Sequence, residues 1–373
     1  MSDKKNAFTR LLGHISVTLI SFIIVGVYVS LAFNLRVFSP IAKAIDDYSF
    51  EDFYYQILGS AASQDTSNVV TIVDMTELQT RSELADLLEQ VYDMKPKVLG
   101  IDIVFEGLKE DTLVDQRLAA VAHNCSSAVF AYKLLDRTDE SVHSFFMSDS
   151  LTEGFVNMPR KLYGGMKRNL SIGRMHQGQL YPSFLKLVAE QYAGEEVAPL
   201  EDKEIRINFS PLHFQIVPYY VLTRHRDLIE DRIVLLGAMK EETDMHYTPL
   251  GKMAGTELLA FGVETLLKQN EVRTLPTWLL CIVSFAIVLL VVLLRKAYMT
   301  FAQNRHMLIE ALMATELCIG LFVFLIIAVI VWVAFILFCV FNLSINLGYA
   351  IAAIAFIYTA NNLYETIIKL INK

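Results

Sequence analysis

The chain has 373 residues, of which 54% are hydrophobic and 19% are charged, and its mean hydropathy is +0.42. It is too apolar for an ordinary soluble protein and too charged for one that lies in the membrane throughout, so we expect several membrane helices and one soluble domain. The net charge of −8 argues against a nucleic-acid-binding protein, which would carry a basic face. Only Cys125 of the four cysteines lies in the polar region, so we expect no disulfide in the soluble domain.

The first expected membrane span lies near the N-terminus. Residues 1–10 carry Lys4, Lys5 and Arg10, and residues 11–33 form an uncharged apolar run of membrane-spanning length. A cleaved signal peptide would have a shorter apolar region followed by small residues at its cleavage site, so we favour an uncleaved anchor with a cytoplasmic N-terminus. We interpret residues 34–68 as a connector.

Residues 69–276 read as one soluble domain in which strands and helices alternate. Apolar runs predict strands over residues 69–74, 98–105, 127–132 and 233–237, and amphipathic runs predict helices over residues 83–94, 114–122, 182–192 and 255–267. We also expect an antiparallel strand over 167–174 and a short helix over 217–223. Strands that alternate with helices at this spacing indicate a parallel sheet covered by helices, so the predicted fold class is α/β, with a mixed, mainly parallel sheet.

Three further spans are expected after the soluble domain, over residues 277–294, 317–341 and 347–364. Basic residues at the N-terminus, in the connector 295–316 and in the tail 365–373 predict that these three segments are cytoplasmic. The turn 342–346 and the soluble domain then lie outside the membrane, which we expect to be a bacterial inner membrane. The connector 295–316 is either an interfacial helix on the lipid or a docking surface for another protein.

Candidate ligand-binding residues follow from the position of the strands. In open α/β sheets, ligands bind where the parallel strands end. That rule selects Asp74 and Glu77, Phe105 and Glu106, Tyr132 and Lys133, and Gly237 with the loop to Thr248. The candidate ligand-binding residues in this part of the sequence are Asp74, Glu77, Asp102, Phe105, Tyr132, Asp244, His246 and Thr248. We expect Asp74, Asp102, Asp244 and His246 to converge, and His246 to respond to pH because histidine changes charge near neutrality.

Structural interpretations of the same residues stay open. Asp102 lies within an apolar run, where an uncompensated charge is costly, so it is also expected to accept hydrogen bonds from neighbouring groups. Asp74 is placed to cap the following turn, and Thr248 precedes a proline that favours an extended turn. The spacing of Asp244 and His246 is too short to indicate a metal site. We find no motif of hydrolytic or phosphate-binding chemistry, so we expect no enzyme activity, no cofactor and no metal.

A series of short motifs resembles the second class of CHASE domains (cyclase/histidine-kinase-associated sensory extracellular domains). In chain order these are residues 70–74 with Glu77, 96–105 around Asp102, Asp115 with Leu118, 154–157, 181–185, Asn208 with its two neighbours, Tyr219 with Leu222, 231–237, Asp244 with His246 and Thr248, and 255–257. The resemblance implies an extracytoplasmic sensory domain and adds Asn208 to the candidate ligand-binding residues. Gly255 and Glu257, at the start of the helix that leads to the membrane, are candidate coupling residues.

The sequence departs from this family in three places. The W-P-W-x-R segment after the first acidic turn is missing, and only Arg81 stands for its arginine. The acidic D-x-D-G turn is also missing from residues 162–168. The family usually continues into a cyclase, kinase or phosphodiesterase, whereas this sequence ends at Lys373, so we expect the output to pass to a separate protein.

The resulting expectation is a bacterial membrane sensor that binds a small ligand or a protein outside and signals to a membrane or cytoplasmic output protein. A second copy of the chain and the lipid bilayer are further expected partners, and nucleic acid is not. The alternative is a structural or assembly subunit of a membrane complex that does not sense. An external enzyme is the least favoured interpretation.

Overall fold

The computed structural model describes residues 2–34, 49–61, 65–109, 111–135, 140–159 and 165–372. The chain divides into two compact units. The first contains Met1–Tyr54 and Arg273–Lys373, and the second contains Tyr55–Val272. Helix α3 (Phe50–Ala61) contains the boundary between them. Part of the predicted connector 34–68, residues 35–48 and 62–64, lies outside the described residues.

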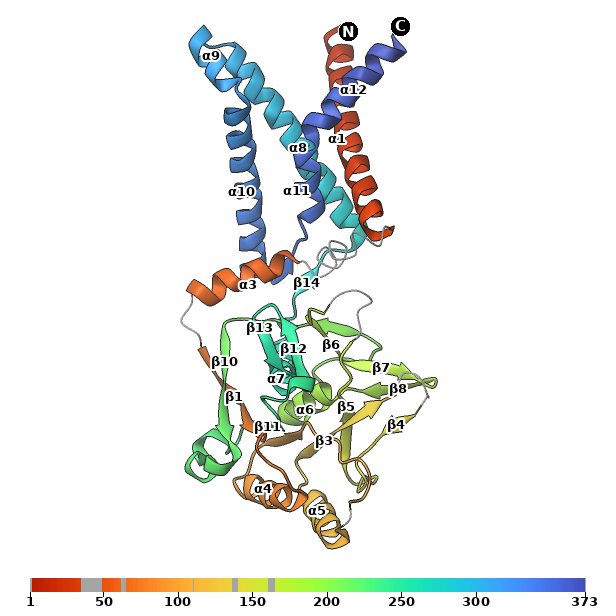
Figure 1. Ribbon diagram of the computed structural model, residues 1–373, viewed down its shortest axis with the longest axis vertical. Coiled ribbons are helices and arrows are strands. Elements are labelled where there is room, and N and C mark those ends of the chain that lie inside the picture. Colours follow the sequence, from red (N-terminus) through yellow and green to blue (C-terminus); the bar gives the residue numbers. More distant parts are fainter. Residues whose placement is uncertain are drawn as a thin grey trace. The chain divides into compact units, whose positions relative to one another are not determined.

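The first unit consists mainly of long apolar helices (Figure 1). Three of them are long and apolar enough to cross a membrane: α1 (Ser2–Asn34), α8 (Thr277–Gln303) and α10 (Glu316–Phe341). The predicted span over 347–364 is divided into α11 (Gly348–Ala355) and α12 (Ile357–Ile371), which meet at a bend of 55°. The described residues therefore contain three candidate spans, or four if the bent pair is one span. Helix α8 extends into the predicted connector, where the short helix α9 (Met307–Met313) follows.

Small and branched side chains hold the helices of this unit together. Val17 of α1, Val288 of α8 and Ala353 of α11 are buried in one apolar cluster. A side chain at Gly13 would begin only 3.1 Å from the hydroxyl of Tyr364 in α12. Close contact through small residues is the usual basis of helix association in lipid, where the hydrophobic effect between helices is absent. A short parallel pair, β14 (Arg273–Thr274) and β15 (Leu343–Ser344), completes the unit.

The second unit is built around a mainly parallel sheet, as the sequence predicted. Its parallel strands run in the order β10 (Leu212–Pro218), β1 (Asp65–Asp74), β11 (Ile233–Gly237), β2 (Val98–Ile101), β3 (Ala128–Leu134) and β5 (Thr152–Phe155). The short strand β4 (Ser141–Val142) pairs antiparallel with the end of β3. Strands β2 and β11 are buried along their whole length, which explains why they appear as uninterrupted apolar runs in the sequence.

Two pairs of helices cover the two faces of the sheet. On one face, α4 (Arg81–Asp93) and α5 (Thr112–Asn124) pack on a core that includes Leu99, Phe130 and Leu236. On the other face lie α6 (Phe184–Ala193) and α7 (Gly255–Lys268), which contact β2, β3, β1 and β11. Gly100 of β2 faces α6, because a side chain there would begin 2.6 Å from Leu235 and 3.0 Å from Phe184. This two-faced burial fixes the positions of the strand ends.

Local capping explains where the helices begin. Thr80 and Glu83 form a capping box at the start of α4, in which each side chain accepts from the backbone amide of the other residue. Asp111 caps α5 and Ser183 caps α6. The N-cap of α7 is Ala254, which has no capping side chain. The first turn of α7 therefore depends on groups from other elements.

Smaller elements complete the second unit. Three antiparallel pairs are β6 (Asn169–Ser171) with β9 (Glu204–Arg206), β7 (Gly173–His176) with β8 (Gln179–Pro182), and β12 (Met245–Thr248) with β13 (Gly251–Ala254). The strand predicted over 167–174 is thus two short strands. Three 3-10 helices are η2 (Tyr219–Arg224), η3 (Arg226–Leu228) and η4 (Glu242–Asp244). The predicted helix over 217–223 begins two residues later, because Val217 and Pro218 still belong to β10.

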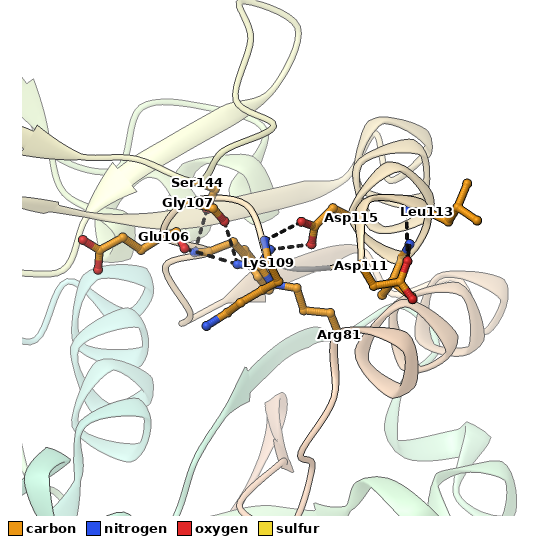
Figure 2. A network of polar contacts seen from close by, with 10 residues as sticks. Arg81, Glu106, Gly107, Lys109, Asp111, Leu113, Asp115 and Ser144 are labelled. Carbon is orange, nitrogen blue, oxygen red and sulfur yellow. Dashed lines mark hydrogen bonds and ion pairs between the residues drawn. The ribbon is translucent and has the colours of Figure 1, made fainter.

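Arg81 clamps the loop that follows β2 onto α5 (Figure 2). Its Nη1 lies 2.5 Å from Oδ1 of Asp115, and its Nη2 donates to the carbonyl oxygens of Glu106 (3.2 Å) and Gly107 (2.8 Å). The backbone amide of Lys109 donates to the other carboxylate oxygen of Asp115, at 2.6 Å. Asp115 is buried, with 2% of its side chain exposed, and Arg81 is half-buried, with 13% exposed. Arg81 therefore has a structural role.

The clamp makes the stability of the second unit depend on pH. Burial alone would raise the pKa of Asp115, but the hydrogen bonds from Arg81 and from the Lys109 amide outweigh it, and the pKa lies below its usual range. A carboxylate with a lowered pKa in the folded state stabilises the fold above its unfolded pKa of about 3.9, and this contribution is lost as the pH falls through the folded value. We expect Asp115→Asn to lower the melting temperature most at pH 7, with a difference that shrinks below about pH 4.

Circular dichroism during heating, on the full chain in detergent at several pH values, tests this prediction. Asp111→Asn is the matched control on the same helix, because asparagine caps a helix about as well as aspartate. A difference between wild type and Asp115→Asn that stays constant from pH 7 to pH 3 would contradict the proposed charge interaction.

Candidate functional site

A pocket of about 610 Å³ lies at the carboxyl ends of the parallel strands. Its walls come from the segments that directly follow five strands: Thr76 after β1, Asp102 after β2, Lys133 at the end of β3, Asn157 after β5, and Asp244 after β11. The first turn of α7 closes one side through Gly255 and Leu259. This is the position that parallel α/β sheets favour for ligands, because the loops that leave the strands converge there.

A hydrogen bond between Thr256 and Asp102 joins α7 to the end of β2. The hydroxyl of Thr256 donates to Oδ2 of Asp102 at 2.7 Å. The backbone amide of Asp102 donates to the carbonyl of Leu236, so that Asp102 continues the parallel ladder with β11. Gly237 at the end of β11 makes room for Thr256, because a Cβ there would lie 1.9 Å from the Thr256 hydroxyl oxygen. The absence of a side chain at Gly237 thus allows the contact.

Asp244 reaches the start of α7 because Gly255 has no side chain. A Cβ at Gly255 would lie 2.5 Å from Oδ2 and 2.7 Å from Oδ1 of Asp244. The other neighbour of this carboxylate is His246, whose Nε2 lies 3.5 Å from Oδ1. The two side chains form an ion pair when the imidazole is protonated. Asp244 thus lies at the mouth of the helix, where the partial positive charge of the N-terminus favours a carboxylate.

The electrostatic environment of Asp102 is unusual for an aspartate. Burial raises its pKa from 3.8 to about 7, although the hydrogen bond from Thr256 lowers it. The charge of Asp244 raises the pKa further, and the charge of Lys133 lowers it. The carboxyl group of Asp102 therefore exchanges its proton near neutral pH, within the pocket. Perturbed acids of this kind are common at functional sites.

Three of the four residues that we expected to converge do so, namely Asp102, Asp244 and His246. Asp74 does not join them. Its Oδ1 accepts from the amide and the hydroxyl of Thr76, at 2.9 and 2.5 Å, and from the amide of Met239 at 3.3 Å. It thus caps the turn after β1 and anchors the loop after β11, which was the structural interpretation. Thr76, the partner in this anchor, lines the pocket instead.

The other candidate ligand-binding residues lie outside the pocket. Glu77 is exposed in a turn, and Phe105 belongs to the core, with its ring 5.2 Å from that of Phe146. Tyr132 is buried and stacks on His143 at 4.7 Å. The side chains of Asn208 and Thr248 donate hydrogen bonds to backbone carbonyl groups. The side-chain amide of Asn208 donates to the carbonyl of Asn270 at 3.0 Å, and the Thr248 hydroxyl donates to the carbonyl of Gly251 at 2.9 Å.

Glu257, the second candidate coupling residue, faces a different pocket. This second pocket of about 500 Å³ is also lined by His213, Lys252 and Phe261. Burial raises the pKa of Glu257, and the charge of His213 lowers it. Gly255 and Leu259 therefore face one pocket while Glu257 and Phe261 face the other, as expected for residues two positions apart on a helix.

The strand-end rule selects Lys133 and Gly237, although neither is among the candidate ligand-binding residues, and it leaves Thr256 out. Lys133 is the one exposed position in the otherwise buried strand β3, and it lies at the carboxyl end. A charged residue at that position was a usable signal. Thr256 and Gly237 act through each other, and no local pattern indicates a contact between residues so far apart. Among the described residues, no group of three His, Cys, Asp or Glu side chains is placed to hold a metal ion.

The two glycines allow a direct test of how α7 is held. We expect Gly237→Ala to destabilise the second unit by about 1–3 kcal/mol, because the new methyl group displaces the buried Thr256. The new methyl group of Gly255→Ala meets only the carboxylate of Asp244, which is the end of a flexible side chain, and alanine favours helices. We therefore expect the free energy of unfolding to change by less than about 1 kcal/mol. Denaturant unfolding of both variants measures the difference. Equal losses in the two variants would contradict the assigned contacts.

Asp102 predicts a second dependence on pH, opposite in sign to that of Asp115. An acid whose pKa is raised in the folded state stabilises the fold below its unfolded pKa, and this stabilisation is lost as the pH rises through the folded value. The difference between 3.8 and about 7 corresponds to about 4 kcal/mol at most. We expect Asp102→Asn, which keeps an acceptor for Thr256, to gain stability relative to wild type between pH 5 and pH 8. Melting temperatures of both proteins at pH 5 and pH 8 test this prediction. An equal fall in melting temperature of wild type and Asp102→Asn between the two pH values would contradict it.

Comparisons with known proteins agree with this arrangement. The family model of the CHASE2 domain matches residues 24–294. No curated protein and no solved structure matches the sequence significantly. CHASE2 domains are sensory extracellular domains, and the match begins within α1, ends within α8 and includes the whole of the second unit. Because the match covers well over half of the sequence, the chain belongs to the CHASE2 family.

Proposed function

We propose that this CHASE2 protein is a bacterial membrane sensor in which the second unit binds a small ligand at the pocket beside α7. The action is binding and not catalysis. The pocket contains acids, a lysine and a histidine, which suit the binding of a charged ligand. The coupling to the membrane runs through α7.

The observation that carries this proposal is that α7 is at once a wall of the pocket and the last helix before a candidate span. Its first turn carries Gly255 and Thr256, which contact Asp244 and Asp102. Its last residue is Lys268, and α8 begins at Thr277. A ligand that changes the position of the two carboxylates changes the contacts that hold the start of this helix.

The packing of α7 favours movement as a rigid body. All residues from Gly255 to Leu266 except Glu257 are buried. Glu264 accepts a hydrogen bond from Ser67 at the start of β1 and lies 3.0 Å from Lys268. Closely packed elements shift between discrete arrangements more readily than they deform. Coupling also requires that the ligand bind the two arrangements with different affinity.

The distribution of basic residues supports the proposed orientation. Arg10, Arg295, Lys296 and Lys369 lie at one set of helix ends, which the positive-inside rule assigns to the cytoplasm. The second unit is then periplasmic. We propose that the output passes to a separate membrane or cytoplasmic protein, for which the α9 region is the candidate contact.

A ligand screen on the full chain in lipid nanodiscs tests the proposal. A ligand at a hundredfold excess over its Kd stabilises the folded state by about 2.7 kcal/mol, which raises the melting temperature by roughly 5–10 °C. We expect hits whose shift is lost in Gly255→Ala and kept in Gly320→Ala. Gly320 is the matched control, because it lies in a helix with nothing near its Cβ position.

Hydrogen exchange with a confirmed hit tests the coupling. We expect altered exchange in residues 255–268 as well as in the loops of the pocket. Changes confined to the loops would contradict transmission through α7. If no compound binds, and a stoichiometric partner co-purifies with both Asp102→Ala and His246→Ala, the chain is an assembly subunit and not a sensor.

A further inference from the structure

The pocket at the strand ends carries more acidic than basic groups. Its titratable lining residues are Asp102, Glu241, Asp244, Lys133 and His246. Three are acids, one is a lysine, and the histidine already faces Asp244. At neutral pH the pocket is therefore negative on balance, and its charge favours a positively charged occupant.

Asp102 and Asp244, which are half-buried, lack the lysine or arginine partners that the buried carboxylates Asp115 and Glu264 possess. Asp115 pairs with Arg81, and Glu264 pairs with Lys268. The ion pairs of the described residues give neither Asp102 nor Asp244 a lysine or arginine. The hydrogen-bond partner of Asp102 is the uncharged hydroxyl of Thr256. Buried charges normally occur in pairs, so this pair of carboxylates has room for an external cation.

Size and wall chemistry indicate an organic cation and not a bare metal ion. The volume of about 610 Å³ is that of a small-molecule site. The walls combine polar and apolar side chains, and the apolar ones include Met75, Val104, Val156, Met158 and Leu259. Methionine side chains adapt to varied apolar shapes. An ammonium group between the carboxylates and an apolar body against these side chains would satisfy both kinds of surface.

We propose that the pocket binds a small organic amine in its ammonium form, with the charged group between Asp102 and Asp244 and the carbon skeleton against the apolar side chains of the wall. The inference rests on the proposed function and specifies its ligand class. Lys133 lies at the edge of the same pocket without an ion pair to either carboxylate, and its exposed side chain is free to withdraw when a cation enters.

Proton release is a consequence of this geometry. The ammonium ion competes with the proton on Asp102, whose pKa of about 7 also reflects Asp244 and Lys133. Only the ionised carboxylate attracts the ligand, so binding tightens as the pH rises. Between pH 6 and pH 8 the ionised fraction of an acid with that pKa increases about tenfold, and we expect the affinity to follow. Glu241 and His246 face the same space and are included in the variants below.

The test measures binding of three probes with one carbon skeleton, hexylammonium, hexanol and hexanoate, to the full chain in nanodiscs by calorimetry. We expect saturable binding of the amine alone. Asp102→Asn and Asp244→Asn should each weaken it at least tenfold, and Asp102→Asn should also remove the pH dependence. Glu241→Gln should weaken it less, and His246→Ala should not weaken it. Asp227→Asn, an exposed position outside the pocket, is the matched control. Melting curves verify that each variant is folded.

The possible failures are distinguishable. If a panel of primary amines binds no tighter than the matched alcohols, the cation assignment is overturned. If hexanoate binds instead and Lys133→Met abolishes that binding, the pocket is an anion site, so the sensor proposal survives and the ligand class is wrong. If the general library screen also yields no ligand, the proposed function fails together with this inference. Amine binding that persists in both asparagine variants would place the ligand elsewhere and overturn the inference.

Discussion

The hydrogen bond from Thr256 to Asp102 is the interaction on which the arrangement of the second unit depends. It joins the first turn of α7, which has no capping side chain, to the end of β2 at 2.7 Å. Two glycines make it possible. Gly237 admits Thr256, and Gly255 admits the carboxylate of Asp244 beside it. The docking of the first turn of α7 beside the pocket follows from this close approach, whereas the raised pKa of Asp102 comes from its burial and is lowered by the hydrogen bond.

Two aspartates show how the surroundings shift the pKa of one residue type in opposite directions. Asp115 is fully satisfied by Arg81 and by a backbone amide, and its pKa is lowered. Asp102 has one neutral hydroxyl as its partner, and its pKa is raised to about 7. A buried charge with a complete set of partners contributes to the fold, whereas one without a cation leaves interaction energy available to a ligand. The contrast lies in the surroundings and is invisible in the sequence.

The strand ends could be predicted from the sequence, but the partners of most side chains could not. Apolar strands alternating with amphipathic helices indicated the parallel sheet, and the geometry of such sheets brought Asp102, Asp244 and His246 to one edge. Asp74 also lies at the end of a parallel strand, but its carboxylate accepts hydrogen bonds from Thr76 and Met239. Asn208 and Tyr132 lie outside the pocket and contact Asn270 and His143, partners that are specified only by the tertiary fold. The bend between α11 and α12 was missed because an apolar run of sufficient length predicts a span but not its straightness.

Helix α7 forms part of the wall of both pockets. Gly255 and Leu259 lie on one pocket, and Glu257 and Phe261 lie on the other. The two residues of each pair are four positions apart, so they lie on the same face of the helix. The second pair is offset from the first by two positions, so the two pairs lie on nearly opposite faces. A shift of α7 that tightens one pocket must therefore change the walls of the other. If ligands occupied both pockets, coupling through α7 would change the two affinities by the same factor, because such coupling is reciprocal. The carboxylate of Asp244 lies against the start of α7 and Glu257 lies within the helix, so an acid is present at each pocket.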